Sequence, residues 1–287
     1  MHELLRRSLA GLSVGDAFGE RFFQPSAVLE AALRDRQVPA TPPWRWTDDT
    51  AMALSVVETL EAFGHIDEVE LGRRFGARYR ADPARGYGRG AHEVLDLLAN
   101  GVAWKQASAS LFEGQGSKGN GAAMRAPPVG AFFAKAEFSK VVEEAHRSAA
   151  PTHAHPEGQA GAVAVAVCAA ALARKLPLAL VWTHVLANTP HGPTRDGLER
   201  ASRLGFDVPV SRAVEVLGSG AKVLSEDTVP FSIWCALRHH DDFEEAMWTT
   251  VSGLGDRDTT CAIVGGLVAL KDAPPEKWVK AREALPR

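Results

Sequence analysis

The sequence predicts an all-α protein, a compact single-domain orthogonal bundle of helices that spans residues 1–287. Apolar residues recur at three-to-four spacing through most of the chain, which is the period of an amphipathic helix. No alternating β-branched runs are joined by a tight turn, and the Asn120-Gly121 pair lies in a glycine-rich loop instead. No linker-like or repeated segment divides the chain, so we expect one domain.

The predicted helices share this apolar periodicity. In chain order they span residues 3–13, 48–63, 67–80, 90–99, 140–149, 157–175, 196–204, 211–217, 229–238, 241–252 and 258–271. Loops are expected at 36–47, 81–90, 113–121 and 187–196, where proline, glycine and polar residues gather. A further short helix is expected to begin near Ala122, directly after the third loop.

The segment "AGAVAVAVCAAALA" (160–173) needs separate justification, because part of it alternates as a strand would. Its alanine content and Pro156, a residue suited to a first helical turn, favour a helix. The apolar stretch is shorter than the roughly 20 residues that a membrane-spanning helix needs. We therefore expect a central core helix in a soluble protein, with no membrane partner.

Composition excludes several function classes. The chain is 46% hydrophobic and 23% charged with a net charge of −3, so it can bury a core and offers no basic field for nucleic acid. Cys168, Cys235 and Cys261 are far apart in apolar runs, which predicts buried free thiols in a reducing compartment. The first nineteen residues contain no secretory apolar core. We expect a cytoplasmic monomer.

Two acidic clusters stand at the heads of predicted helices. One is Thr47-Asp48-Asp49-Thr50 and the other is Asp256-Arg257-Asp258-Thr259. Either cluster could simply cap its helix, because Asp and Thr are favoured there. One cap needs only one acid, however, and a second adds repulsion that a counter-ion would relieve. Carboxylates and hydroxyls suit Mg²⁺, and the lack of Cys or His disfavours zinc. The residues alone leave both interpretations open.

Three further motifs have competing interpretations. The loop before Ala122 could offer backbone N–H groups to a diphosphate, or be a flexible surface loop. Arg125, just beyond it, is better explained as an internal anchor. His153 and His155 have a spacing that does not make a metal pair on one helix face. The "HHDD" stretch (239–242) resembles part of a phosphohydrolase motif, but Asp242 capping the following helix explains it better.

Five motifs occur in an order that resembles the ADP-ribosylglycohydrolase family. They are "GDAFG" (15–19), "WTDDTAMAL" (46–54), "GNGAAMRAPPVG" (119–130), "THAHP" (152–156) and "GDRDTTCAIVGGL" (255–267). The resemblance extends from about residue 4 to residue 278. It implies an all-α fold with a cleft that holds two Mg²⁺ ions, or Mn²⁺ in their place.

The resemblance also implies roles for individual residues. The metal ligands would be Thr47, Asp48 and Asp49 from one side of the cleft and Asp256, Asp258 and Thr259 from the other. Contacts to ADP-ribose would come from Ser117, Lys118, Gly119, Asn120, Gly121, Met124 and His153.

The catalytic base stays open among Asp48, Asp49 and Glu20. Family members resembling the serine-type enzymes have a glutamate seven residues after the Asp of the "GDA" motif, where this chain has Phe23. Glu20, four residues after Asp16, could take the same place. Asp16 itself is expected to fix a helix end.

The expected function is Mg²⁺-dependent hydrolysis of the N- or O-glycosidic bond between ADP-ribose and a protein side chain or small acceptor. The partner would be an ADP-ribosylated protein or a small ADP-ribose conjugate. The alternatives are a non-catalytic ADP-ribose-binding or structural member of the fold, and a metal-dependent phosphohydrolase.

Overall fold

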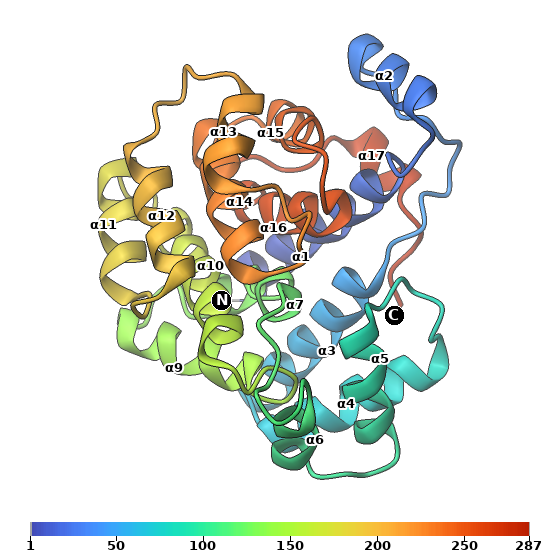
Figure 1. Ribbon diagram of the computed structural model, residues 1–287, viewed down its shortest axis with the longest axis vertical. Coiled ribbons are helices and arrows are strands. Elements are labelled where there is room, and N and C mark those ends of the chain that lie inside the picture. The colour runs from blue at the N-terminus through green and yellow to red at the C-terminus, as the bar shows by residue number, and fades with distance from the viewer. Residues whose placement is uncertain (1, 287) are drawn as a thin grey trace.

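The computed structural model describes residues 2–286, which form helices and loops without a β-strand. These helices pack into one compact body (Figure 1), which confirms the all-α, single-domain prediction. They are α1 (His2–Glu20), α2 (Ser26–Asp35), α3 (Asp48–Phe63), α4 (Glu68–Ala81), α5 (Arg89–Ala99), α6 (Trp104–Ser110), α7 (Gly121–Met124), α8 (Pro127–Phe132), α9 (Phe138–Ala149), α10 (Pro156–Ala173), α11 (Leu178–Asn188), α12 (Pro193–Arg203), α13 (Val210–Leu217), α14 (Ser225–Arg238), α15 (Phe243–Val251), α16 (Arg257–Val268) and α17 (Glu276–Ala281).

Helices α1 and α16 lie against each other in the middle of the body (Figure 1). Glycines allow their backbones to touch. A Cβ atom on Gly11 would lie 2.2 Å from the carbonyl oxygen of Gly265, and one on Gly15 would lie 2.0 Å from that of Cys261. Only glycine can occupy such positions, because any side chain would collide with backbone. The same close approach brings the first turn of α16, with Asp258, beside the end of α1.

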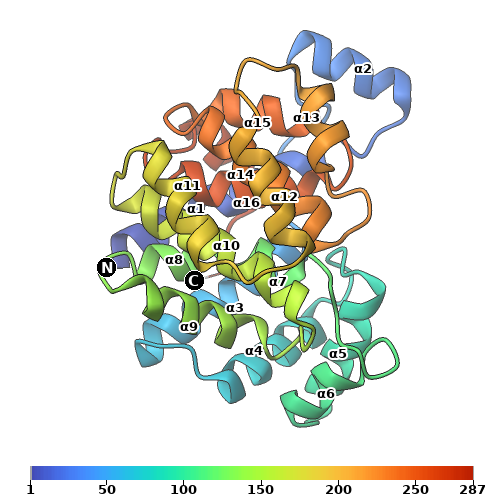
Figure 2. The ribbon, with the colours of Figure 1, turned by 60° about the vertical axis from the view of Figure 1, so that its left-hand side comes forward.

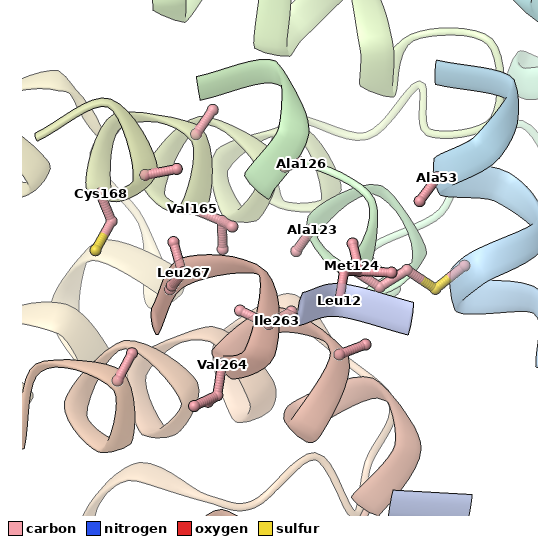
Figure 3. Packing of buried hydrophobic residues seen from close by; sticks show 14 of the residues in the cluster. Leu12, Ala53, Ala123, Met124, Ala126, Val165, Cys168, Ile263, Val264 and Leu267 are labelled. Atoms are coloured by element: carbon pink, nitrogen blue, oxygen red, sulfur yellow. The ribbon is translucent and has the colours of Figure 1, made fainter. Parts of the chain in front are cut away.

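Helix α10 is the core helix that the sequence predicts. It packs against α7, α8, α9, α11 and α14. By length and composition α10 could cross a membrane, but 78% of its residues are buried inside the protein. Small side chains let its neighbours approach closely, and Figure 3 shows Val165 of α10 beside Leu267 of α16. Cys168, Cys235 and Cys261 are buried and free, as predicted.

Most predicted helices are confirmed, several of them to within two residues at each end. Helix α3 spans the residues expected for it, and α7 begins at Gly121, one residue before the expected start. Helix α1 continues to Glu20 rather than ending at residue 13, because glycines 15 and 19 pack against α16. Helices α2, α6, α8, α11 and α17 were not among the helices predicted.

Helix α2 stands apart from the other helices in both views (Figure 1 and Figure 2). It interrupts the path from α1 to α3, and Arg36 at its end pairs with Glu245 of α15. The chain then returns through Trp44, whose N–H donates to Ala281 O at 2.6 Å and whose carbonyl accepts from Glu283 N at 2.8 Å. The C-terminal segment therefore holds the residues that lead into α3.

Candidate active site

A cavity of about 620 Å³ opens beside the first turns of α3, α7 and α16. Its wall has three chemically different parts. One part consists of carboxyl groups, a second is the glycine-rich loop, and a third consists of apolar side chains. The lining includes Asp48, Asp256, Asp258, Thr259, Ser117, Lys118, Gly119, Asn120, Gly121, Met124, His153, Val94, Leu95, Leu111, Phe112 and Val223.

The two acidic clusters meet at this cavity. Asp48 comes from α3, whereas Asp256 and Asp258 come from the start of α16, about two hundred residues later. Asn120 of the glycine-rich loop donates from Nδ2 to Asp256 Oδ2 at 2.7 Å, which ties the loop to the second cluster. Sequence alone could not decide whether the clusters meet, and the structure brings them together.

The cap of α3 comes from a different helix. Asp16 of α1 is fully buried and accepts hydrogen bonds from the backbone N–H groups of Thr47 and Thr50, each at 3.0 Å. Thr47, the residue at the N-cap position, makes no side-chain capping bond. A carboxylate on the first N–H groups of a helix satisfies donors that otherwise have no partner. Asp16 therefore fixes the helix end, as expected, and Asp48 and Asp49 are free for another role.

The carboxyl groups behind the cavity cannot all be ionised without a counter-charge. Thr47 Oγ1 lies 2.8 Å from Asp16 Oδ1 and 2.9 Å from Asp49 Oδ2. A hydroxyl has one proton to donate, so Thr47 cannot fully satisfy both carboxylates at once. Burial raises the pKa of Asp16 to about 6, and burial followed by repulsion from Asp258 raises that of Asp49.

The carboxyls that face the cavity also have raised pKa values. Burial, followed by repulsion from Asp16, raises the pKa of Asp48 to about 8. Burial and the neighbouring Asp256 raise the pKa of Asp258. Both side chains are only partly exposed, so water screens them weakly. A cation bound among them would lower these pKa values and allow the carboxylates to ionise together.

The donor atoms fit a hard divalent cation. Asp49 Oδ1 and Asp258 Oδ1 are buried without a hydrogen-bond partner, which is costly unless another ligand satisfies them. Carboxylate and hydroxyl oxygens are the ligands that Mg²⁺ prefers, and it keeps several waters. Within residues 2–286, no three His, Cys, Asp or Glu side chains already converge as a complete ligand set. Water would therefore have to complete the coordination of any ion held here.

Hydrogen bonds to the start of α14 hold the glycine-rich loop. Asn120 N donates to Val223 O at 3.2 Å, and Ser225 N donates to Lys118 O at 3.0 Å. A Cβ atom on Gly116 would lie 2.6 Å from His155 N, so the loop also rests directly on the backbone before α10. These contacts make the loop an ordered wall of the cavity rather than a flexible surface loop. Its predicted contact residues 117–121, together with Met124 and His153, all line the cavity.

Sequence reasoning missed the apolar part of the cavity wall. Phe112 lines the cavity and is 56% exposed, and its ring lies over Gly90, where a Cβ atom would come within 3.2 Å of it. Val223, 54% exposed, lines the cavity from the loop before α14. Both residues have positive φ angles, 52° and 57°, which is uncommon for residues other than glycine. An exposed aromatic directly before the glycine-rich loop was the only available signal.

Several predicted features lie outside the cavity lining. Thr47 and Asp49, two of the predicted metal ligands, are buried and do not line the cavity. Glu20 ends α1 and lies 3.8 Å from Arg21 Nη2, while burial raises its pKa. It is not among the cavity-lining residues, so its catalytic role stays a prediction. In the "HHDD" stretch, His239 Nε2 lies 2.9 Å from Thr249 Oγ1. Asp242 accepts from Glu245 N at 3.0 Å, which confirms that it caps α15.

Comparison with known proteins gives consistent results over the whole chain. A sequence profile of the ADP-ribosylglycohydrolase family matches residues 1–285. ADP-ribosylhydrolase ARH3 of Homo sapiens is 30% identical over 323 residues, covering 97% of this chain and 88% of that protein. Its counterpart in Gallus gallus is 28% identical over 330 residues, covering 98% and 89%. A solved "ADP-ribosylglycohydrolase-related protein complex" shares the fold with a TM-score of 0.66 and 24% identity, covering 99% of this chain and 94% of that one.

Proposed function

The chain belongs to the ADP-ribosylglycohydrolase family, and from that membership we propose that its cavity binds an ADP-ribosyl group and releases it by hydrolysis. The bond that breaks would join the anomeric carbon of the terminal ribose to a protein side chain or small acceptor. One observation carries the proposal. A single cavity is lined by carboxylates, an ordered glycine-rich loop and apolar side chains.

The three parts of the wall match the three parts of ADP-ribose. The ribose that reacts would lie at the carboxyl end, beside Asp48 and Asp258. The diphosphate would lie along the loop of residues 117–121, where backbone N–H groups and Lys118 suit anionic oxygens. The adenine would lie at the apolar end, against Phe112. Binding energy gained from the diphosphate and adenine would then orient the ribose for reaction.

Two divalent cations, Mg²⁺ or Mn²⁺, are part of the proposal. Thr47, Asp48 and Asp49 would hold them from α3, and Asp256, Asp258 and Thr259 from α16. Such ions, when bound, polarise oxygen atoms and lower the pKa of water. The orphaned oxygens of Asp49 and Asp258 support this assignment, as does the mutual repulsion of the carboxyls.

Among the three candidates for the base, we assign Asp48. It lines the cavity, whereas Asp49 is fully buried behind Thr47 and Glu20 lies outside the lining. Hydrolysis at an anomeric carbon passes through an oxocarbenium-like transition state. The Asp48 carboxylate would accept the proton of the attacking water, and the surrounding carboxylates would stabilise the positive charge that develops on the ribose.

The test offers arginine-, serine- and O-acetyl-linked ADP-ribose to the purified protein with Mg²⁺, with Mn²⁺ and with a chelator. We expect metal-dependent release of free ADP-ribose from at least one substrate and a loss of at least about a hundredfold in the Asp258→Asn variant. Asp241→Asn is the matched control, because Asp241 is an exposed aspartate that lies outside the cavity lining.

Three results would contradict the proposal. Asp258→Asn as active as the wild type would remove the metal mechanism. Release of phosphate or AMP would identify a phosphohydrolase. Binding of ADP-ribose without turnover of any substrate would identify a binding or structural protein.

A further inference from the structure

Arg125 follows α7 and is completely buried. Its Nη1 donates to Gly121 O at 2.8 Å, and its Nη2 donates to Ser148 O at 2.9 Å and to Thr152 Oγ1 at 2.8 Å. No carboxylate in the described chain forms an ion pair with it. A buried charge without a counter-charge is costly, and burial lowers the pKa of this guanidinium to about 9. Hydrogen bonds to neutral groups and the Phe75 ring, whose centre lies 4.6 Å from the guanidinium carbon, hold this charge in the core.

Thr152 links Arg125 to His153. A guanidinium only donates, so Thr152 Oγ1 accepts from Arg125. The same oxygen lies 2.7 Å from His153 Nδ1 and 3.4 Å from Ala149 O. We assign the Thr152 proton to the short contact, which makes Nδ1 the acceptor, and the tautomer measured below tests this assignment.

The opposite edge of the His153 ring faces the glycine-rich loop. Its Nε2 atom lies 3.6 Å from the Cβ position of Gly119 and 3.6 Å from that of Gly121. The side chain lines the cavity, and no group of residues 2–286 hydrogen-bonds Nε2. A neutral imidazole that accepts at Nδ1 carries its proton on Nε2. That N–H group points at the part of the cavity bordered by the loop.

We propose that Arg125 and Thr152 are positioning residues that hold His153 as an Nε2–H donor to a phosphate oxygen in the loop region of the cavity. The ligand group follows from the chemistry, because a fixed neutral donor beside glycine backbone suits an anionic oxygen. This inference rests on the proposed function for the identity of the ligand, ADP-ribose. The tautomer of His153 in the free protein does not depend on it.

The buried guanidinium also keeps the ring uncharged. Burial first, and the charge of Arg125 second, lower the pKa of His153 to about 3. The neutral backbone of Gly158 packs against the ring, and Gln159 Nε2 donates to the backbone carbonyl of His153 at 2.8 Å. A single neutral tautomer would thus persist over the pH range in which the protein is folded.

The first measurement is the ¹⁵N chemical shift of both ring nitrogens in the full-length free protein, with His153 assigned by its absence from the His153→Ala variant. Wild type and Thr152→Ser, which keeps the hydroxyl, should both show the Nε2–H tautomer. Thr152→Val lacks the hydroxyl and should show Nδ1–H or a mixture of tautomers. Thermal unfolding of each variant checks that the fold is kept.

The second measurement is the affinity for ADP-ribose and for adenosine, which lacks phosphate. Thr152→Val should bind ADP-ribose about tenfold more weakly than Thr152→Ser does, and adenosine equally well. In the His153→Ala background, Thr152→Val should change ADP-ribose affinity less than about twofold, because Thr152 acts through His153.

Four outcomes overturn the inference. A charged or Nδ1–H ring in the wild type would do so, as would a Thr152→Val variant that keeps both the tautomer and the affinity. Loss of adenosine binding in Thr152→Val would indicate a structural role for Thr152, and so would an undiminished effect in the His153→Ala background. If the wild type binds no ADP-ribose, the proposed function fails. The ring tautomer still decides whether Arg125 and Thr152 position His153 as inferred.

Discussion

Replacing Gly15 with alanine tests how closely α1 and α16 are packed. The new Cβ atom would lie 2.0 Å from the carbonyl oxygen of Cys261 and 2.7 Å from its carbonyl carbon. Both neighbours belong to the backbone of α16, so no side-chain rotation can relieve the clash. Restoring a contact of about 3.4 Å requires the helices to separate locally by about 1.4 Å.

The expected cost follows from two opposing terms. Overpacking a well-packed core costs about 1–3 kcal/mol, and an unyielding backbone neighbour puts this case at about 3 kcal/mol. Alanine in place of glycine within a helix stabilises the folded protein by about 1 kcal/mol. The free energy of unfolding should therefore fall by about 2 kcal/mol, which lowers the melting temperature of a domain of this size by about 3 °C.

Urea denaturation followed by circular dichroism measures the change. Gly72→Ala is the matched control, because Gly72 lies inside α4 and the nearest atom to its Cβ position is a side-chain atom at 3.4 Å. That variant should be at least as stable as the wild type. A Gly15→Ala protein as stable as the wild type would refute the argument for a backbone contact between α1 and α16.

Two further predictions concern the cavity. In the metal-free protein, the free energy of unfolding should fall as pH rises from about 4 to about 8. The reason is that the folded state binds protons more tightly than the unfolded chain, because the pKa of Asp16 is raised to about 6 and that of Asp48 to about 8. Denaturation at several pH values in the presence of a chelator measures this. Saturating Mg²⁺ should reduce the dependence of the free energy of unfolding on pH, and a stability that rises with pH would contradict the prediction. Phe112→Ala should weaken ADP-ribose binding about tenfold by calorimetry, because it removes the stacking surface for the base. Phe63→Ala removes an aromatic that is 46% exposed, against 56% for Phe112, and that lies outside the cavity, so it should leave the affinity unchanged.

Helices with a regular apolar pattern could be predicted from the sequence, whereas helices without one were missed. Helix α3 was expected at 48–63 because its apolar residues repeat with the helical period through to the αL residue Gly64, which ends it. Helix α2 was missed because it buries only Leu29 and Ala32. Helix α8 was missed because it begins at Pro127 and Pro128, which interrupt any local pattern although both suit a first turn.

The site shows the same limit of local information. The doubled acid at Asp48 and Asp49 suggested a second function, but the residue that replaces them as the cap is Asp16, on another helix. Likewise, Phe112 and Val223 line the apolar end of the cavity although they are more than a hundred residues apart. Neither the capping by Asp16 nor the joint lining by Phe112 and Val223 can be read from a local sequence pattern, because both contacts form only when the helices pack.

The hydrogen bonds of Trp44 with Ala281 and Glu283 affect the stage of synthesis at which the protein can complete its fold. During synthesis, α3 leaves the ribosome long before the residues that hold its approach segment have been translated. The second acidic cluster is also made late, so a nascent chain contains Asp48 without Asp258. Contacts of such long sequence separation form slowly and late in folding. The hydrolytic site should therefore mature only after residues 281–283 have left the ribosome, and a nascent chain that lacks them should be inactive.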